Sequence, residues 1–424
     1  MNAELRCILC LDIDCFFAQV LLKDRPDLKD KPVGIRQKYI IVTCTYEARK
    51  LGIKKLMLIK DALELVPELI ILDGSDITPF RAAGRQLFQV ARATLGNIPI
   101  ERKGFDEIYA DITEPCLVLM QDKKNEGSIC EYFGEVFPRK IFSENTEIFQ
   151  AGSEIAIELR SEISMRLGFK SCAGISSSKF AAKLASNFTK PNNQTVFLPH
   201  FPEYVEYFQS LPVSYLPGLG RSTFRLLKVQ GLNNTIKTCG DLTSALPKER
   251  LAQVLNGDLD FASQLLELAI GIDHRKVENM DMFTSQLSRE ETKLPHPTNA
   301  VDLKLRVQEL IGPLFDLIQE RIDKTLEIPK SLKLSIKFRG ELNRRSKSRR
   351  FVEFLLDEDY LSRMSSELLN EFNLPPSFVA THVNLGVSDF GEDPFVLDKG
   401  EPERAPNSLD KYFTPSEDRK KMKT

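Results

Sequence analysis

Two short acidic stretches, far apart in the sequence, carry the side chains best suited to chemistry. The first holds Asp12 and Asp14 directly after the apolar run 7–11, and the second holds Asp106 and Glu107 shortly after Gly104. Carboxylates at the ends of apolar strands cost free energy unless a cation neutralises them. A pair of Mg²⁺ ions would neutralise them and would also hold a triphosphate for in-line displacement.

Spacing alone assigns only part of this ligand set. Side chains alternate along a strand, so Asp12 and Asp14 are expected on one face, and the adjacent Asp106 and Glu107 on opposite faces. Asp106 and Glu107 can face one pair of ions only if the chain turns there, which Gly104 permits. Taken alone, each stretch is equally typical of surface carboxylates at a strand end.

The elements that must position these carboxylates alternate between strands and helices. Strands are predicted over residues 5–11, 31–35, 39–44, 106–113 and 172–175, and helices over residues 18–23, 46–51, 84–95, 154–167 and 176–186. Because the order is not strictly βαβ, it favours a mixed α/β sheet over a doubly wound one. The mixed, charged stretch 116–146 is predicted to be an insertion loop between a strand and a helix.

From about residue 203 the pattern changes to short helices, with a glycine-containing hairpin among them. Gly218 and Gly220 precede a helix predicted to begin at Arg221, so amides at its start could hold a DNA phosphate. Arg221 and Arg225 flank the hairpin, which favours that interpretation. The alternative is a plain turn between two helices.

The last part of the chain predicts a small α+β domain with a basic sheet face. A polar, linker-like stretch at 276–295 precedes one long helix over 300–322, an alternating strand over 331–339 and a last strand over 383–387. Such a face would lie against a phosphate backbone. The candidate contacts are Lys337, Arg339, Arg344, Arg345, Lys347, Arg349 and Arg350. A solvated basic hairpin is the alternative.

Composition excludes several other classes of protein. The chain has 424 residues, 42% of them apolar, and a net charge of −2, so nucleic-acid affinity must come from local patches. Asp12 and Asp14 interrupt the first apolar run too early for a secretory signal, and no apolar stretch is long enough to span a membrane. Cys7 and Cys10 form a CxxC pair, but they diverge on a strand and no second pair completes a zinc site. Core cysteines in a reducing compartment are expected instead.

In combination, these motifs resemble those of the Y-family, the translesion DNA polymerases. They appear in the family's order: the two acidic stretches, Tyr46-Glu47-Ala48-Arg49, the segment 172–186, and Lys190-Pro191-Asn192. The resemblance covers about residues 5–390, and the segments 42–57 and 104–107 look most like one branch of the family. It implies a multidomain α/β and α+β protein, a right-hand polymerase. Its domains would be a palm (1–30 and 96–202), fingers (31–95), a thumb (203–280), a linker (281–298), a little finger (299–390) and a disordered tail (391–424).

The resemblance also implies roles for individual residues. Asp12, Asp106 and Glu107 would be catalytic and would bind two Mg²⁺ or Mn²⁺ ions, with the Ile13 carbonyl as a further ligand. Asp14 would then lie behind the metal ligands rather than beside Asp12. The nucleotide would be bound by residues from three segments: Tyr46, Arg49 and Lys179 at the triphosphate, backbone amides of Cys15, Phe16 and Phe17, and Gln37, Ile40 and Thr43 at the nascent base pair.

Two further predictions depend on the resemblance. Phe17 would be a steric gate that collides with a ribose 2′-OH, and the alternative for this ring is a place in the core. In the tail, Leu409, Tyr412 and Phe413 suggest a turn that docks into a sliding clamp, although Pro406 stands where such a motif usually has glutamine. Ser178 likewise departs from the family, which usually has asparagine there.

The function expected from the resemblance is low-fidelity, template-directed insertion of nucleotides opposite damaged bases, without proofreading. Primer-template DNA and deoxynucleoside triphosphates would be the substrates, the nucleus the location, and no membrane a partner. Two alternatives stay open. A nucleotide cyclase would need neither the hairpin nor the basic sheet, and a catalytically silent DNA-binding scaffold would need no carboxylate set.

Overall fold

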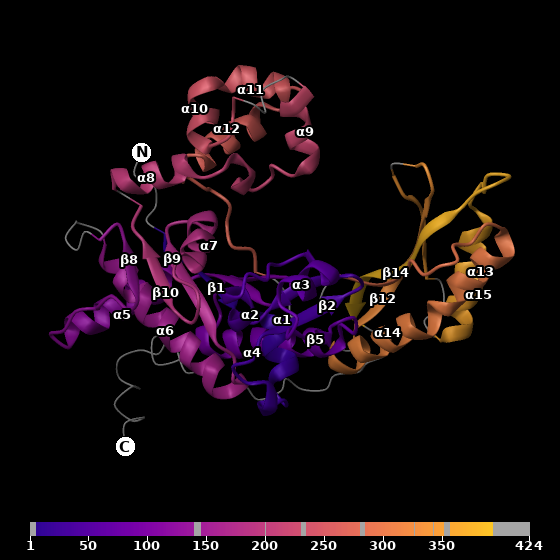
Figure 1. Cartoon of the computed structure of the whole chain (residues 1–424), viewed down its shortest axis with the longest axis horizontal. Coiled ribbons are helices and arrows are strands. Elements are labelled where there is room, and N and C mark those ends of the chain that lie inside the picture. Colours follow the sequence, from indigo (N-terminus) through magenta and orange to yellow (C-terminus); the bar gives the residue numbers. More distant parts are fainter. Residues whose placement is uncertain are drawn as a thin grey trace. The chain divides into compact units, whose positions relative to one another are not determined.

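In a computed structural model of the chain (Figure 1), the apolar run before Asp12 forms strand β1 (Ile8–Ile13) of a six-stranded sheet. The structure describes residues 6–139, 146–199, 201–229, 235–279, 285–325, 327–341, 343–351 and 357–392. The chain divides between residues 280 and 281 into two units. Among the described residues, no helix is both long and apolar enough to cross a bilayer.

The six strands follow the order β6 (Ile100–Lys103), β7 (Glu107–Asp111), β1, β9 (Ser171–Ser176), β10 (Gln194–Phe197) and β8 (Glu135–Phe137). β1 runs antiparallel to both β7 and β9, whereas β10 runs parallel to β9 and β8. The sheet is therefore mixed, as the order of predicted elements indicates. Every residue of β1 and β9 is buried, which explains the run of apolar residues in each strand.

Helices cover both faces of this sheet. α6 (Glu147–Leu167) packs on one face, where Gly152 approaches Ile175, and α5 (Thr113–Asn125) and α4 (Thr78–Leu95) pack against α6. α7 (Lys179–Phe188) packs on the other face, where a Cβ at Gly174 would lie 2.0 Å from the Ala182 carbonyl oxygen. Only a glycine allows α7 to lie this close to β9. Neighbouring residues of a strand point to opposite faces, so α6 and α7 sandwich the sheet.

A second sheet of four strands holds the tyrosine–arginine motif. Its order is β4 (Met57–Leu58), β3 (Ile40–Cys44), β2 (Val33–Gln37) and β5 (Ile70–Asp73). Helices α1 (Phe16–Leu22), α2 (Tyr46–Lys50) and α3 (Ile59–Leu65) pack around it. Thr45 ends β3 and caps α2 by accepting a hydrogen bond from the Ala48 amide at 3.4 Å, so α2 begins at Tyr46.

Short helices complete the first unit. They are α8 (Pro202–Ser210), α9 (Arg221–Val229), α10 (Cys239–Ala245), α11 (Lys248–Val254) and α12 (Leu259–Leu268). Their apolar side chains share one core with α7 and β10, where Phe180 lies edge-on to Phe208 and Phe197 packs nearby. The helical segment is thus fixed to the helix that carries Lys179.

The second unit is a four-stranded antiparallel sheet with helices on one face. Its order is β11 (Gln286–Glu291), β14 (Ala380–Glu392), β12 (Glu327–Phe338) and β13 (Arg345–Arg350). The helices are α13 (Ala300–Glu309), α14 (Ile311–Thr325) and α15 (Glu358–Asn370). Leu332, Leu334 and Ile336 of β12 are buried in their shared core, which confirms the predicted alternation of that strand.

Two predictions of secondary structure are wrong. The stretch 116–146 is not simply a loop, because α5 occupies its beginning and β8 lies within it. Buried Cys116 and Leu119, three positions apart, give α5 its inner face despite the charges around them. The long helix over 300–322 is interrupted after Glu309, since Pro313 cannot donate to the carbonyl four residues earlier.

The stretch predicted as a linker differs from expectation in its second half. β11 lies within residues 276–295 and pairs with β14 along six positions from Gln286 to Glu291. Its side chains alternate between exposed and half-buried. An edge strand of this kind can have a polar sequence, which is why the stretch resembled a linker. The predicted tail residues Leu409, Tyr412 and Phe413 lie outside the described residues.

Candidate functional site

The two acidic stretches meet at the end of β1. Asp12 is the register partner of Glu107, so the two side chains share one face of the sheet. Gly104 has a φ of 71° in the turn between β6 and β7, and Asp106 lies in that turn rather than in a strand. The turn is held in place, because the Ile13 amide donates to the Asp106 carbonyl at 3.0 Å. Asp106 is therefore released from strand alternation, which Gly104 permits, and the strand predicted over residues 106–113 begins one residue later, at Glu107.

A lysine lies between the paired carboxylates. The ammonium group of Lys183, on α7, donates to Asp12 Oδ2 at 2.6 Å and to Glu107 Oε2 at 2.6 Å. Lys190 donates to the other oxygen of Asp12, and the Tyr109 hydroxyl donates to Glu107 Oε1. All four oxygens of the pair thus accept a hydrogen bond from a neighbouring side chain.

Electrostatics distinguish Asp12 from Asp106. Burial raises the pKa of Asp12, but Lys183 and Lys190 outweigh burial and hold it below its usual range. Burial raises the pKa of Asp106, and the nearby charge of Asp12 raises it further. The metal-free site therefore holds Asp12 as a carboxylate, while protonation of Asp106 is easier than usual.

Asp14 faces a different set of partners. Its carboxylate accepts from the Tyr46 hydroxyl at 2.9 Å and from the Asn192 amide at 2.7 Å, with the Cys172 thiol at 3.3 Å. Asp14 lies beyond the end of β1, and its own amide donates to the Lys170 carbonyl instead of to a strand. The strand alternation that paired it with Asp12 does not extend this far. Asp14 instead ties Tyr46 of α2 to the end of the six-stranded sheet.

The two adjacent phenylalanines have different environments. Phe16 is buried, with 2% of its surface exposed, whereas Phe17 is half-buried. The Phe17 ring stacks on Phe80 of α4, with centroids 3.9 Å apart and planes 5° apart. Phe17 thus presents a braced ring at the start of α1, close in sequence to Asp12.

The candidate phosphate ligands lie on two helices. On α2, the Arg49 guanidinium lies 4.7 Å from the centre of the Tyr46 ring. On α7, Lys179 pairs with Glu101 of β6 and lies 5.4 Å from the Tyr109 ring. Tyr109 in turn contacts Glu107, which connects Lys179 to the carboxylates. That Arg49 and Lys179 bind one and the same ligand stays a prediction.

The remaining predicted nucleotide contacts lie near the start of α1 and on the second sheet. Cys15 precedes α1 with a φ of 45°, which turns the chain into the helix. The Gln37 side-chain amide donates to the Gly74 carbonyl at 2.6 Å, and Ile40 and Thr43 are half-buried on β3. Among these, Gln37 is the most firmly fixed.

A strap from the helical segment fixes the start of α7. Asp273 is buried, and its carboxylate accepts from the Phe180 amide at 3.0 Å and from Arg275 at 2.8 Å. The Lys276 carbonyl contacts the Lys179 ammonium at 3.4 Å. Ser178 caps the same helix by accepting from Ala181, so its departure from the family's asparagine leaves the cap intact.

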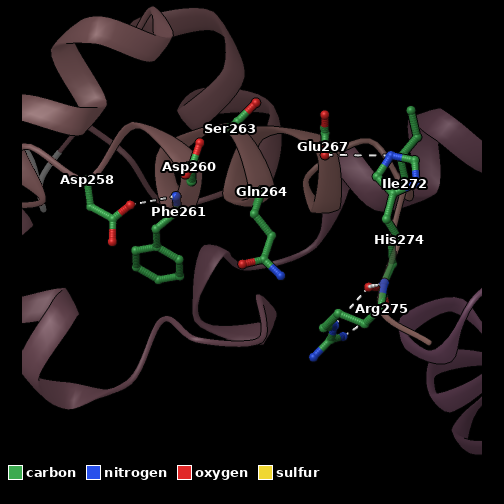
Figure 2. Close-up of a pocket in the computed structure, with 10 residues that line it drawn as sticks. Asp258, Asp260, Phe261, Ser263, Gln264, Glu267, Ile272, His274 and Arg275 are labelled. Carbon is green, nitrogen blue, oxygen red and sulfur yellow. Dashed lines mark hydrogen bonds and ion pairs between the residues drawn. The ribbon is translucent and has the colours of Figure 1, made fainter. Parts of the chain in front are cut away.

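The same strap borders an open pocket of about 760 Å³ (Figure 2). α12 contributes the other wall, with Asp260, Phe261 and Glu267 among the lining residues. His274 points toward Glu267 across 3.8 Å, and both side chains are largely exposed. The lining mixes acidic, apolar and basic groups without a set of convergent donors, so it does not define a second reactive site.

The acidic cluster fits a divalent cation by its chemistry. Its oxygens are the hard donors that Mg²⁺ and Mn²⁺ prefer, and Asp12 and Glu107 already share one positive group. Within the residues that the structure describes, no group of three or more His, Cys, Asp or Glu side chains is arranged to hold a metal ion by itself. Lys183 and Lys190 lie among the carboxylates instead.

The predicted hairpin is a tight connection into α9. Gly218 has a φ of 89°, and a Cβ there would lie 2.8 Å from the Phe261 ring. Gly220 has open space around its missing side chain, which leaves the first amides of α9 approachable. Arg221 begins that helix, and its side chain lies outside what the structure describes.

The basic residues of the second unit divide between two faces of its sheet. Arg345, Lys347 and Arg349 lie opposite the buried Ile336, Leu334 and Leu332, so they point to the helix side. There Arg345 pairs with Glu341, and Arg349 with Glu367 and Glu371.

The face without helices holds the other basic residues. Lys337 alternates with the buried Ile336 and Phe338, and Arg350 lies opposite Ser331. Arg344 contacts Glu290 of β11 at 2.6 Å, and Arg339 is exposed just past β12.

Sequence reasoning missed several residues that build the site. Lys183 and Lys190 were part of the quoted motifs but had no assigned role, and Glu101 and Asp273 were not singled out. Lys183 follows Lys179 by four positions, so helical spacing places both on one side of α7. That signal was available, whereas the contacts of Glu101 with Lys179 and of Asp273 with Phe180 join residues too far apart in sequence to be inferred.

The structure thus defines the chain as a multidomain α/β protein with buried, lysine-paired carboxylates at the end of a central strand of its mixed sheet. The chain matches the impB/mucB/samB family over residues 11–187. It is 31% identical to DNA polymerase IV of Mannheimia succiniciproducens over 345 residues, which cover 80% of this chain and 84% of that protein. The chain therefore belongs to this family, the Y-family, as the resemblance of its motifs predicted.

Two relatives represent the branch that the sequence resembles most. The chain is 34% identical to DNA polymerase iota of Homo sapiens over 323 residues, 75% of this chain and 42% of that protein. It is 33% identical to DNA polymerase iota of Mus musculus over 314 residues, 73% of this chain and 42% of that protein. The chain thus spans less than half the length of these two relatives.

Proposed function

We propose that this chain is a DNA-directed DNA polymerase that inserts nucleotides opposite damaged template bases, with low fidelity and without proofreading. The observation that carries the proposal is the convergence of Asp12, Asp106 and Glu107 at the end of β1. Family membership and the polymerase names of the relatives support it. The structure supports it further, because Asp12 and Glu107 are register partners and Asp106 lies in the turn directly before Glu107.

The described elements suit a right-hand division of the chain. The six-stranded sheet would be the palm (1–30 and 96–202), and the four-stranded sheet with α2 and α3 the fingers (31–95). The helices around the Gly218 hairpin would be the thumb (203–280). The second unit would be the little finger (predicted as 299–390) and would also include β11, which lies in the stretch predicted as a linker (281–298); residues 391–424 would be a tail.

The carboxylates would hold two divalent cations, Mg²⁺ or Mn²⁺, with the Ile13 carbonyl beside them. When bound there, such ions supply Lewis-acid stabilisation of the triphosphate and lower the pKa of the attacking hydroxyl. Asp106 and Glu107 would present their oxygens from the turn and from β7. Asp14 would keep Tyr46 in position through their hydrogen bond.

Nucleotide binding would use both helices that carry basic groups. Tyr46, Arg49 and Lys179 would contact the triphosphate oxygens, which charge-assisted hydrogen bonds favour. Amides of Cys15, Phe16 and Phe17 would contribute at the start of α1. The Phe17 ring, braced by Phe80, would exclude a ribose 2′-OH, and Gln37, Ile40 and Thr43 would line the nascent base pair.

DNA would contact two surfaces. The first amides of α9 after Gly220 suit a backbone phosphate. On the second unit, the helix-free face with Lys337, Arg339, Arg344 and Arg350 suits a phosphate backbone better than the helix side does. On the helix side, Arg345, Lys347 and Arg349 would contact DNA only where their side chains reach past the edge of the sheet.

The proposed partners are primer-template DNA, deoxynucleoside triphosphates and, through the tail motif, a sliding clamp in the nucleus. A primer-extension assay with purified protein and Mg²⁺ tests the proposal. Extension by one or more nucleotides is expected. Binding of primer-template without any extension would favour the silent scaffold, and turnover of triphosphate without a primer would favour a cyclase.

A further inference from the structure

The paired carboxylates already have a cation, and it belongs to the protein. Lys183 donates to both Asp12 and Glu107, and Lys190 and Tyr109 take the two remaining oxygens. The exposed fractions of the Lys183, Asp12 and Glu107 side chains are 27%, 12% and 13%, so little water screens these contacts.

Lys183 is held in place by backbone packing. α7 lies against β9 at Gly174, where the Ala182 carbonyl would meet any Cβ at 2.0 Å. The residue after Ala182 is Lys183, so the closest point of the helix–sheet contact sets its position. Lys179, one turn earlier, instead pairs with Glu101. The two lysines of α7 thus have separate partners.

A divalent cation would need the same oxygens. Mg²⁺ binds carboxylate oxygen at about 2.0–2.1 Å, and Lys183 lies 2.6 Å from one oxygen of each carboxylate. Two positive groups on shared ligands at this range repel each other strongly in a partly buried site. Lys183 has a flexible stem and can turn away, whereas Asp12 and Glu107 are fixed by their strands.

We propose that Lys183 is a resident counter-ion of the carboxylate pair, a positioning residue that must leave when a divalent cation binds. It keeps Asp12 and Glu107 together in the metal-free protein and weakens the intrinsic affinity of the site for metal. The inference rests on the proposed metal-dependent function and adds a role for Lys183, to which that proposal assigns none.

The test is direct binding of Mn²⁺ to the full chain, without DNA or nucleotide, by calorimetric titration. Lys183→Met keeps the length of the side chain and removes its charge. We expect this variant to bind Mn²⁺ about tenfold more tightly than the unaltered protein, as removal of one repelling charge predicts. Lys124→Met, at an exposed position of α5, is the control for loss of one positive charge and is expected to leave the affinity unchanged.

Unfolding temperature supplies a second readout. Without metal, Lys183→Met leaves two carboxylates facing each other and should unfold at a lower temperature than the unaltered protein. Saturating Mn²⁺ should remove most of that difference, because the ion replaces the lost ammonium group. An affinity for Mn²⁺ that is unchanged or weaker in Lys183→Met overturns the inference.

A measurement on the unaltered protein avoids dependence on the variant's folding. Brief acylation of lysines, followed by mass spectrometry, should label Lys183 weakly without metal and several times more strongly with Mn²⁺, while labelling of Lys124 stays constant. Equal labelling of Lys183 in both states overturns the inference. If Asp106→Asn leaves Mn²⁺ binding intact, the metal site itself is wrongly placed. If Asp106→Asn abolishes it while Lys183 responds to neither test, only the counter-ion role fails.

Discussion

At the scale of the residue, Asp12 and Asp14 show that the alternation of side chains predicts a shared face only as far as the strand extends. Two positions apart, they would share a face if the strand continued, but β1 ends at Ile13. The Asp14 amide bonds to the Lys170 carbonyl, and its carboxylate receives Tyr46. The resemblance to the family assigned Asp14 to a supporting place where spacing alone did not.

The stacked Phe17 ring gives a first prediction. Phe17→Ala should raise insertion of ribonucleotides relative to deoxyribonucleotides by about tenfold or more, because a hydrophobic wall of this size is worth about 1–3 kcal/mol of discrimination. Insertion efficiency with each nucleotide, before and after the substitution, is the measurement. Leu22→Ala is the control, because it removes another partly exposed apolar side chain of the same helix. Phe16→Ala would not serve, since Phe16 is buried. A ratio unchanged in Phe17→Ala would place this ring in the core and not at the sugar.

Asp106 gives a prediction about pH. Burial and the charge of Asp12 raise its pKa in the folded protein, so the folded state favours the protonated form. Its contribution to metal-free stability is therefore fully present below the unfolded pKa of about 3.9 and is lost as pH rises through the folded value. Asp106→Asn, which is neutral throughout, should be more stable than the unaltered protein near pH 7, with the difference shrinking toward pH 4.

Thermal unfolding at several pH values, with a chelator present, measures this difference. Asp61→Asn, at an exposed position of α3, is the control for loss of one carboxylate outside the cluster. A stability difference for Asp106→Asn that grows as pH falls would contradict the raised pKa.

Sequence reasoning identified Gly104 as a residue that permits a turn, because the tolerance of a positive φ is a property of that one residue. It did not predict Lys183 between the carboxylates, because that contact depends on how closely α7 lies on β9. The distance between α7 and β9 depends on Gly174, which belongs to β9. The residues next to Lys183 in the sequence give no indication of it. The carboxylates could thus be named in advance, but not the cation that accompanies them.

At the scale of the element, β13 shows that a basic run is not one surface. Alternation sends Arg345 and Arg349 to the helix side, where glutamates neutralise them, and sends Arg350 to the face without helices. The sequence displays every charge but not its partner. The same limit applies to β11, whose polar composition suggested a linker because an edge strand buries little apolar surface.

The division of charges predicts the salt dependence of DNA binding. Lys337→Ala and Arg350→Ala together should weaken binding regardless of DNA sequence and should lower the slope of log K against log salt by up to about 2, since each phosphate contact contributes about 0.9. The double variant Arg345→Ala with Arg349→Ala is the matched comparison and should change the slope by less. Fluorescence anisotropy over a range of salt measures both. A larger effect from the paired arginines would place DNA on the helix side.

At the scale of the whole molecule, the chain has two units, each with its own hydrophobic core. The first holds the carboxylates, and the second presents an open basic face. Their own cores follow from clear apolar patterns, which is why most of their elements could be predicted. Breaks such as the one at Pro313 were harder to place, because the helical pattern of apolar residues continues on both sides.

The tail belongs to this scale because its proposed role concerns assembly. Removal of residues 405–424 should leave insertion by the isolated protein unchanged and abolish stimulation by a sliding clamp, because Leu409, Tyr412 and Phe413 would share one face of a helical turn. The measurement is primer extension with and without the clamp, with Tyr412→Ala plus Phe413→Ala as the point-substituted counterpart. Stimulation that survives both changes would show that the clamp binds elsewhere or not through this motif.

Asp12, Asp106 and Glu107 are proposed to act together in nucleotide insertion. Single-turnover insertion by Asp106→Ala on a primer-template, with Mg²⁺, tests it most directly, and Glu126→Ala at an exposed site is the control. We predict a fall in insertion rate of at least about a hundredfold, typical for loss of a group that stabilises charge in the transition state, with DNA affinity largely unchanged. Insertion by Asp106→Ala at close to the rate of the unaltered protein would contradict the account.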